Sequence, residues 1–89
     1  MKYVMSYELA PGGLPKAMEQ GPAHAARLRE FHAKGVLLMA GPFADPTQGA
    51  LGIFTTREAA EEFIRGDPFV TEGVVGRWTV KEWREVLVD

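Results

Sequence analysis

The order in which two periodicities follow one another restricts the fold of this chain more than any other feature. Strand-like segments show either alternation with a period of two or a short continuous apolar run, and apolar side chains recur at helical spacing in other segments. The strand-like segments are residues 2–9, 36–40, 50–54 and 78–81, and the helical ones are 22–34 and 55–66. This order predicts an α+β fold of ferredoxin-like β-α-β-β-α-β design, with both helices on one face of a four-stranded antiparallel sheet.

Local signals suggest where the two helices begin and end. Proline and glycine are frequent in residues 10–21, which predicts a loop, and Pro22 suits the first turn of a helix. Gly35 is expected to end that helix in a left-handed conformation. Thr55 and Glu58 have the spacing of a capping box, which predicts the start of the second helix.

The length of 89 residues predicts a single domain, residues 1–89. A chain this short buries only about 60% of the surface that its unfolded form exposes, so small folds gain from a staple, a metal or a partner. The chain has no cysteine, which excludes disulfides and thiolate metal sites. Self-association is therefore the expected reinforcement.

The strands predict how the chain would associate. Residues 36–40 form a continuous apolar run, which favours a strand buried on both faces, and few positions of residues 2–9 are polar. Helices on one face leave the other face of the sheet to be covered. We expect a homodimer in which two sheets pack face to face. The alternative is a monomer whose long loops fold over the sheet.

Charge and motifs exclude several classes of partner and cofactor. The formal net charge is −2 and no basic patch is apparent, which argues against nucleic acid. The apolar run at the N-terminus is too short for a signal peptide and too polar for a membrane span, so we expect a cytoplasmic protein without membrane contact. Two histidines eight residues apart give no metal site, and no glycine-rich phosphate loop is present. No cofactor is expected.

Two residues are candidates for acid/base chemistry. His24 is predicted in the first turn of the first helix, on the face toward the sheet, where the helix dipole keeps it neutral unless an acid compensates. A structural role beside Leu28 is the alternative. Asp67 precedes Pro68, so its carboxylate either serves the turn or reaches the His24 imidazole and orients it.

Further residues are expected to contact a small-molecule ligand. Gly41, Pro42 and Phe43 follow a strand end, where backbone can approach a ligand closely, although they can equally be a plain strand terminator. Tyr7 and Phe69, together with Phe43, are expected to line a pocket between the helices and the sheet.

Residues 21–28, 35–42 and 67–74 resemble the YCII-related domain family, in order and over nearly the whole chain. The resemblance implies a dimeric α+β barrel, related in fold to muconolactone isomerase. It also implies that His24 and Asp67 correspond to the histidine and aspartate of the family's catalytic or binding dyad. Many relatives carry an arginine just before the Pro-Ala-His segment, where this chain has Gly21.

Our leading hypothesis is an enzyme in which His24 moves a proton on a small cyclic or carbonyl compound, in an isomerisation or elimination. A pocket and one acid/base pair suffice for such chemistry. Two alternatives are a non-catalytic small-molecule binding or accessory module, and a dimerisation domain whose pocket has no function.

Overall fold

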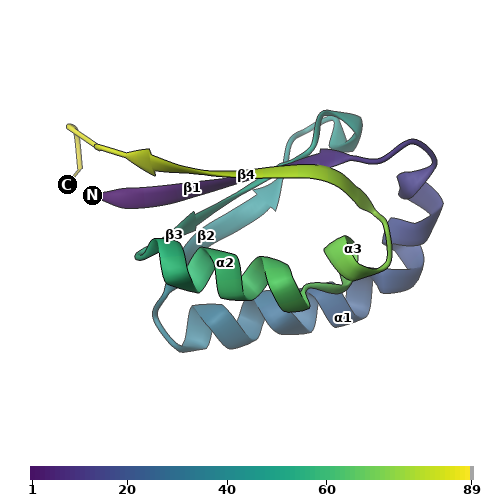
Figure 1. Ribbon diagram of the computed structural model, residues 1–89, viewed down its shortest axis with the longest axis horizontal. Helices are drawn as coiled ribbons and strands as arrows, with labels where there is room; N and C mark the ends of the chain where they lie inside the picture. Colours follow the sequence, from purple (N-terminus) through teal and green to yellow (C-terminus); the bar gives the residue numbers. More distant parts are fainter. Residues whose placement is uncertain (89) are drawn as a thin grey trace.

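A computed structural model describes residues 1–88 of the chain. The sheet has four antiparallel strands in the order β2-β3-β1-β4. The strands are β1 (Lys2–Leu9), β2 (Leu37–Pro42), β3 (Ala50–Phe54) and β4 (Val75–Trp83). The helices are α1 (Gly13–Ala33), α2 (Arg57–Gly66) and the short α3 (Pro68–Thr71), with a 3-10 turn, η1 (Pro46–Gln48). All three α-helices lie on one side of the sheet (Figure 1), which confirms the ferredoxin-like α+β fold.

The first helix begins much earlier than predicted. α1 starts at Gly13 and runs through Pro22, so the loop predicted up to Gly21 is wrong. The helix tolerates Pro22 because only one backbone N–H is lost there, and the carbonyl that it would have bonded belongs to Met18, whose side chain is 84% exposed. The predicted end is confirmed, because Gly35 has a φ of 80°.

The strand predicted to be buried on both faces is an edge strand. In β2 only Leu37 is buried, and Leu38 through Pro42 are exposed. The strand continues through Gly41 and Pro42, since a proline without an N–H fits an edge that has no neighbour on one side. An apolar run alone does not distinguish an edge strand from a central one.

The core lies between the sheet and the helices. Met5 and Tyr7 of β1 and Phe54 of β3 point toward the helices, where they meet Phe63 and Ile64 of α2, all at most 5% exposed. This confirms the helical spacing of apolar side chains predicted for residues 55–66. The opposite positions of the central strands, such as Val4 and Ile53, face the side of the sheet that carries no helix.

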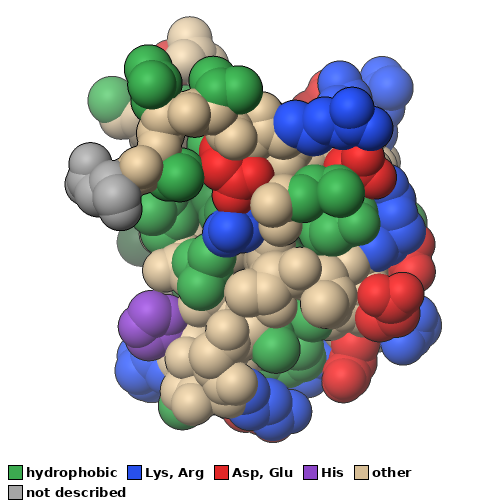
Figure 2. Space-filling view, turned by 90° about the vertical axis from the view of Figure 1, so that its left-hand side faces the viewer, with side chains coloured by type: hydrophobic (Ala, Val, Ile, Leu, Met, Phe, Trp, Pro, Cys, Tyr) green, Lys and Arg blue, Asp and Glu red, His purple; other side chains and the backbone are tan. Residues whose placement is uncertain are grey.

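The start of β1 and the end of β4 lie beside each other at one end of the sheet (Figure 1). Glu85 joins them, with its carboxylate 3.0 Å from the N-terminal amine and 2.7 Å from the Lys2 amine. Figure 2 looks onto this end of the molecule and shows hydrophobic side chains gathered around oppositely charged groups. Within residues 1–88 no helix is long and apolar enough to cross a bilayer.

The N-cap of α2 is Thr56 and not the predicted Thr55. The Thr56 hydroxyl accepts a hydrogen bond from the N–H of Ala59 at 3.1 Å. We expect Thr56→Ala to lower the free energy of unfolding by about 1 kcal/mol, the usual cost of a lost cap. Thr55→Ala is the matched control and should change it by less than about 0.5 kcal/mol. Chemical denaturation of both variants checks this, and a larger loss in Thr55→Ala would contradict the assigned cap.

Candidate active site

A buried aspartate forms the centre of the site. Asp67 ends α2 and caps α3, and its side chain is fully buried. Its carboxylate takes part in three hydrogen bonds. Oδ2 accepts from the Tyr7 hydroxyl at 2.6 Å, Oδ1 accepts from the Phe69 N–H at 3.2 Å, and Oδ1 lies 2.8 Å from Nδ1 of His24. The turn role and the contact with His24, which the sequence left as alternatives, are both present.

Tyr7 remains a hydrogen-bond donor in the folded protein. Its ring lies inside the sheet–helix layer, only 5% exposed. Burial, and then the hydrogen bond to Asp67, raise the pKa of the Tyr7 phenol far above its usual value of 10.0. The neutral phenol therefore donates to Asp67 across the physiological pH range.

His24 is held from two directions. It lies in the middle of α1, not in the first turn as predicted, because the helix begins at Gly13. The dipole of the helix N-terminus therefore does not act on it. Its ring stacks on Phe69, with ring centres 3.7 Å apart and planes within 4°. Its Nδ1 faces the Asp67 carboxylate.

These contacts decide which ring nitrogen of His24 is free. An ionised carboxylate only accepts hydrogen bonds, so Nδ1 of His24 must carry a proton and donate it to Asp67. In the neutral ring this leaves a lone pair on Nε2. Nε2 makes no hydrogen bond to the protein. Within residues 1–88 every buried side-chain nitrogen or oxygen has a hydrogen-bond partner, so Nε2 is not buried and is accessible from the space around the ring.

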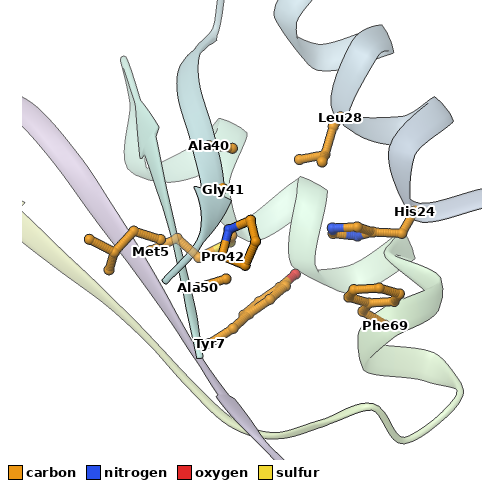
Figure 3. A pocket seen from close by; sticks show the side chains of 10 residues that line it. Met5, Tyr7, His24, Leu28, Ala40, Gly41, Pro42, Ala50 and Phe69 are labelled. Carbon is orange, nitrogen blue, oxygen red and sulfur yellow. The ribbon is translucent and has the colours of Figure 1, made fainter. Parts of the chain in front are cut away.

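The surroundings of His24 are a cavity of about 270 Å³ between α1 and the sheet (Figure 3). The His24 ring projects into it from α1, opposite Pro42 of β2 and above the Tyr7 hydroxyl (Figure 3). The lining residues come from five elements and are Met5, Tyr7, His24, Leu28, Ala40, Gly41, Pro42, Ala50, Leu51 and Phe69. A basic nitrogen thus faces an apolar space large enough for a small molecule.

The residues expected to contact a ligand divide into two groups. Tyr7, Gly41, Pro42 and Phe69 lie around this cavity. Phe43 does not belong to the lining and is 41% exposed, because the chain turns away after Pro42 and pairs the Phe43 N–H with the Gly49 carbonyl. Among residues 1–88 no three histidine or acidic side chains converge as a metal site would require.

Arg27 is a positioning residue that the sequence patterns did not reveal. From α1 it donates hydrogen bonds to the carbonyls of Glu62 and Phe63, at 2.8 and 3.0 Å, near the end of α2. A Cβ on Gly66 would lie 2.6 Å from its guanidinium, so any larger residue there would displace the Arg27 side chain. These two hydrogen bonds hold the end of α2 against α1, and so they also position the start of the turn that carries Asp67.

The sequence is similar to a known protein family and to two bacterial proteins. The profile of the YCII-related domain matches residues 1–84. Protein YciI of Escherichia coli is 35% identical, with 98% of this chain and all of the relative covered. An uncharacterised protein of Haemophilus influenzae is 30% identical with the same coverage.

The comparison with solved structures bears on the fold. A similar structure is 5-chloro-2-hydroxyhydroquinone dehydrochlorinase (TftG) from Burkholderia phenoliruptrix, in complex with 2,5-dihydroxybenzoquinone. The TM-score is 0.80 at 22% identity, over 97% of this chain and 96% of the other. At this identity the likeness supports the fold.

The hydrogen bond from Tyr7 to Asp67 predicts an effect on stability. Tyr7→Phe leaves a buried carboxylate oxygen without its donor, so it should lower the free energy of unfolding by about 1–3 kcal/mol. Tyr3→Phe is the matched control, since the Tyr3 hydroxyl makes only an exposed 3.8 Å contact to a methionine sulfur. Equal stability of Tyr7→Phe and the wild type would contradict the contact.

The raised pKa of Tyr7 predicts how stability changes with pH. A group whose pKa is raised by folding stabilises the fold below its unfolded pKa, and this contribution is lost as pH rises above about 10. Tyr7 is the only tyrosine of the Tyr3→Phe variant. In that variant, tyrosinate absorbance should therefore appear only together with unfolding. Ionisation in a protein that stays folded would contradict burial of the phenol.

Proposed function

Because this chain belongs to the YCII-related domain family, and because one of its histidines presents a free nitrogen to an apolar cavity, we propose that it is a small-molecule enzyme. The reaction is an isomerisation or elimination on a small cyclic or carbonyl compound, with His24 as the acid/base group. The observation that carries the proposal is the 2.8 Å contact between Nδ1 of His24 and the buried Asp67 carboxylate. This contact directs Nε2 toward the cavity.

The proposed step is a proton transfer. Nε2 of His24 takes a proton from a substrate carbon that a neighbouring carbonyl acidifies, and the electron pair of the broken C–H bond passes into an enolate. The imidazolium that forms is stabilised by Asp67, 2.8 Å away and shielded from water. The proton then returns to another atom of the substrate in an isomerisation. In an elimination the electron pair of the enolate expels a leaving group as an anion, and the His24 imidazolium gives its proton to that anion or to water.

The cavity supports a small and largely apolar substrate. Aliphatic and aromatic side chains such as Leu28, Pro42 and Phe69 form most of its wall. A dry wall strengthens the attraction between the imidazolium and Asp67. The structural relative TftG is named for the dehydrochlorination of a small ring compound, which agrees in kind with an elimination.

Proton exchange tests the proposal without knowledge of the natural substrate. In D₂O the protein should catalyse exchange of the acidic C–H protons of cyclic ketones and hydroxyquinones, followed by NMR. Chloride release from 5-chloro-2-hydroxyhydroquinone, the compound that appears in the name of TftG, extends the panel to elimination. His24→Gln should reduce the rate by about 10²-fold or more, the usual contribution of a general base. His32→Gln is the matched control, because His32 is exposed and bonds only the Leu37 carbonyl.

Asp67→Asn distinguishes an enzyme from a binding module. The amide can keep an acceptor for Nδ1, but it lacks the charge that stabilises the imidazolium, so turnover should fall while ligand affinity stays within about threefold. Equal activity of the wild type and His24→Gln across the whole panel would contradict the proposed reaction.

We also propose that the protein is a homodimer formed through the side of the sheet that carries no helix. Val4, Leu51 and Ile53 form an apolar group on this open face beside Ser6, and Met39 on the edge strand is 67% exposed. A second copy packed against the open face would bury these side chains.

Ile53→Lys tests the dimer, because it places a charge at the centre of the open face. Sedimentation equilibrium should give twice the chain mass for the wild type and a dissociation constant at least 10²-fold weaker for Ile53→Lys. Met18→Lys is the control, since Met18 is 84% exposed on the helical side. A monomeric wild type at micromolar concentration would contradict the proposal.

A further inference from the structure

A second cavity adjoins the one beside His24. A space of about 90 Å³ lies along the first turns of α1, where Leu14 and Ala17 form part of its wall. Pro42, Ala50 and Phe69 line both cavities, so the two meet at these residues. Figure 3 shows the three shared residues, with Pro42 and Ala50 on the sheet side and Phe69 below His24.

Gly21 lies on α1 between the residues that line the two cavities. Ala17 belongs to the second cavity and His24 and Leu28 to the first. At about 100° per residue, these three residues and Gly21 fall within an arc of roughly 60° on one face of the helix. A Cβ built on Gly21 would meet no atom within 4 Å. Gly21 is not itself part of either lining, but the space in front of it on this face of the helix is open.

Helix stability does not explain why a glycine stands at position 21. Gly21 has no positive φ, and glycine is the least favourable helix residue after proline. The free space would accept a larger side chain, and a better helix former would strengthen a helix that already contains Pro22. A ligand that passes in front of Gly21 accounts for the missing side chain.

The walls define the chemistry of that ligand. Among residues 1–88 no lysine, arginine, aspartate or glutamate side chain lines either cavity. An apolar cavity of about 150 Å³ already admits benzene, so the larger cavity accommodates a ring, and 90 Å³ suits a short alkyl group. A charged substituent would lose its hydration there without a partner.

We propose that the site takes an uncharged ring compound with a short apolar substituent. The ring lies beside His24, and the substituent passes Gly21 into the second cavity. This inference deepens the proposed function, since it rests on the His24 cavity being the ligand site.

Para-alkylphenols are suitable probes because the phenol hydroxyl can donate to Nε2 of His24 while the alkyl chain enters the second cavity. Calorimetry with phenol and its 4-methyl, 4-ethyl and 4-propyl derivatives should show affinity rising roughly fourfold per methylene in the wild type, the gain expected for a buried CH₂. 3-(4-Hydroxyphenyl)propionate has a chain of similar length that ends in a carboxylate. It should bind at least tenfold more weakly than 4-propylphenol.

Gly21→Leu should remove the dependence on chain length and leave the affinity for phenol itself within about twofold. Leucine favours the helix and meets no atom at its Cβ, so the variant is expected to fold. Ala26→Leu is the matched control, because Ala26 is exposed on the opposite side of α1, and it should keep the wild-type dependence.

The two proposals fail in different ways. Flat affinity along the alkyl series, or no phenol binding at all, overturns the substituent cavity even if proton exchange is catalysed. Equal or tighter binding of the carboxylate overturns the preference for an uncharged ligand. Affinity that depends on chain length and is blocked by Gly21→Leu supports the cavity. If the protein shows this binding behaviour but catalyses no proton exchange, the result overturns the proposed reaction and leaves the ligand class standing.

Discussion

The buried carboxylate of Asp67 is the constraint on which the rest of the site depends. A charge removed from water must be compensated by nearby donors, and here they come from three separate elements. The Tyr7 hydroxyl belongs to β1, the His24 ring to α1 and the Phe69 N–H to α3. Folding therefore cannot complete its core without assembling the site, because Asp67 would otherwise remain buried without partners. The same contacts tie the sheet to the helices and fix the orientation of the imidazole.

The chemistry follows from how these hydrogen bonds are shared. Tyr7 and Nδ1 of His24 both point inward to Asp67, which leaves Nε2 as the basic atom directed at an otherwise apolar space. Phe69 makes two contacts in the site, since its backbone N–H donates a hydrogen bond to the Asp67 carboxylate and its ring stacks on the His24 imidazole. Arg27 keeps the end of α2 in place, so that the turn at Asp67 starts from a fixed position. The free space in front of Gly21 is where we propose that a ligand substituent passes.

Features decided by local physics could be predicted from the sequence. The bounds of β3 and the left-handed Gly35 agree with the structure, because alternation and glycine φ preferences act over a few residues. Features that depend on distant parts of the chain were less accessible. The edge position of β2 depends on which strands pair, and Pro22 predicts a helix start although α1 runs through it. His24 and Asp67 are 43 residues apart, so spacing could not show their contact, and it was the family resemblance that pointed to the pair.

The position of the proton on the His24 ring tests the central claim most directly. Long-range ¹H–¹⁵N correlation spectra of the histidine side chains, recorded where the rings are neutral, distinguish the two tautomers. The account predicts that His24 carries its proton on Nδ1, donated to Asp67, with Nε2 unprotonated toward the cavity. A neutral His24 with its proton on Nε2 would contradict it, because the nitrogen facing the cavity would then have no lone pair with which to accept a substrate proton.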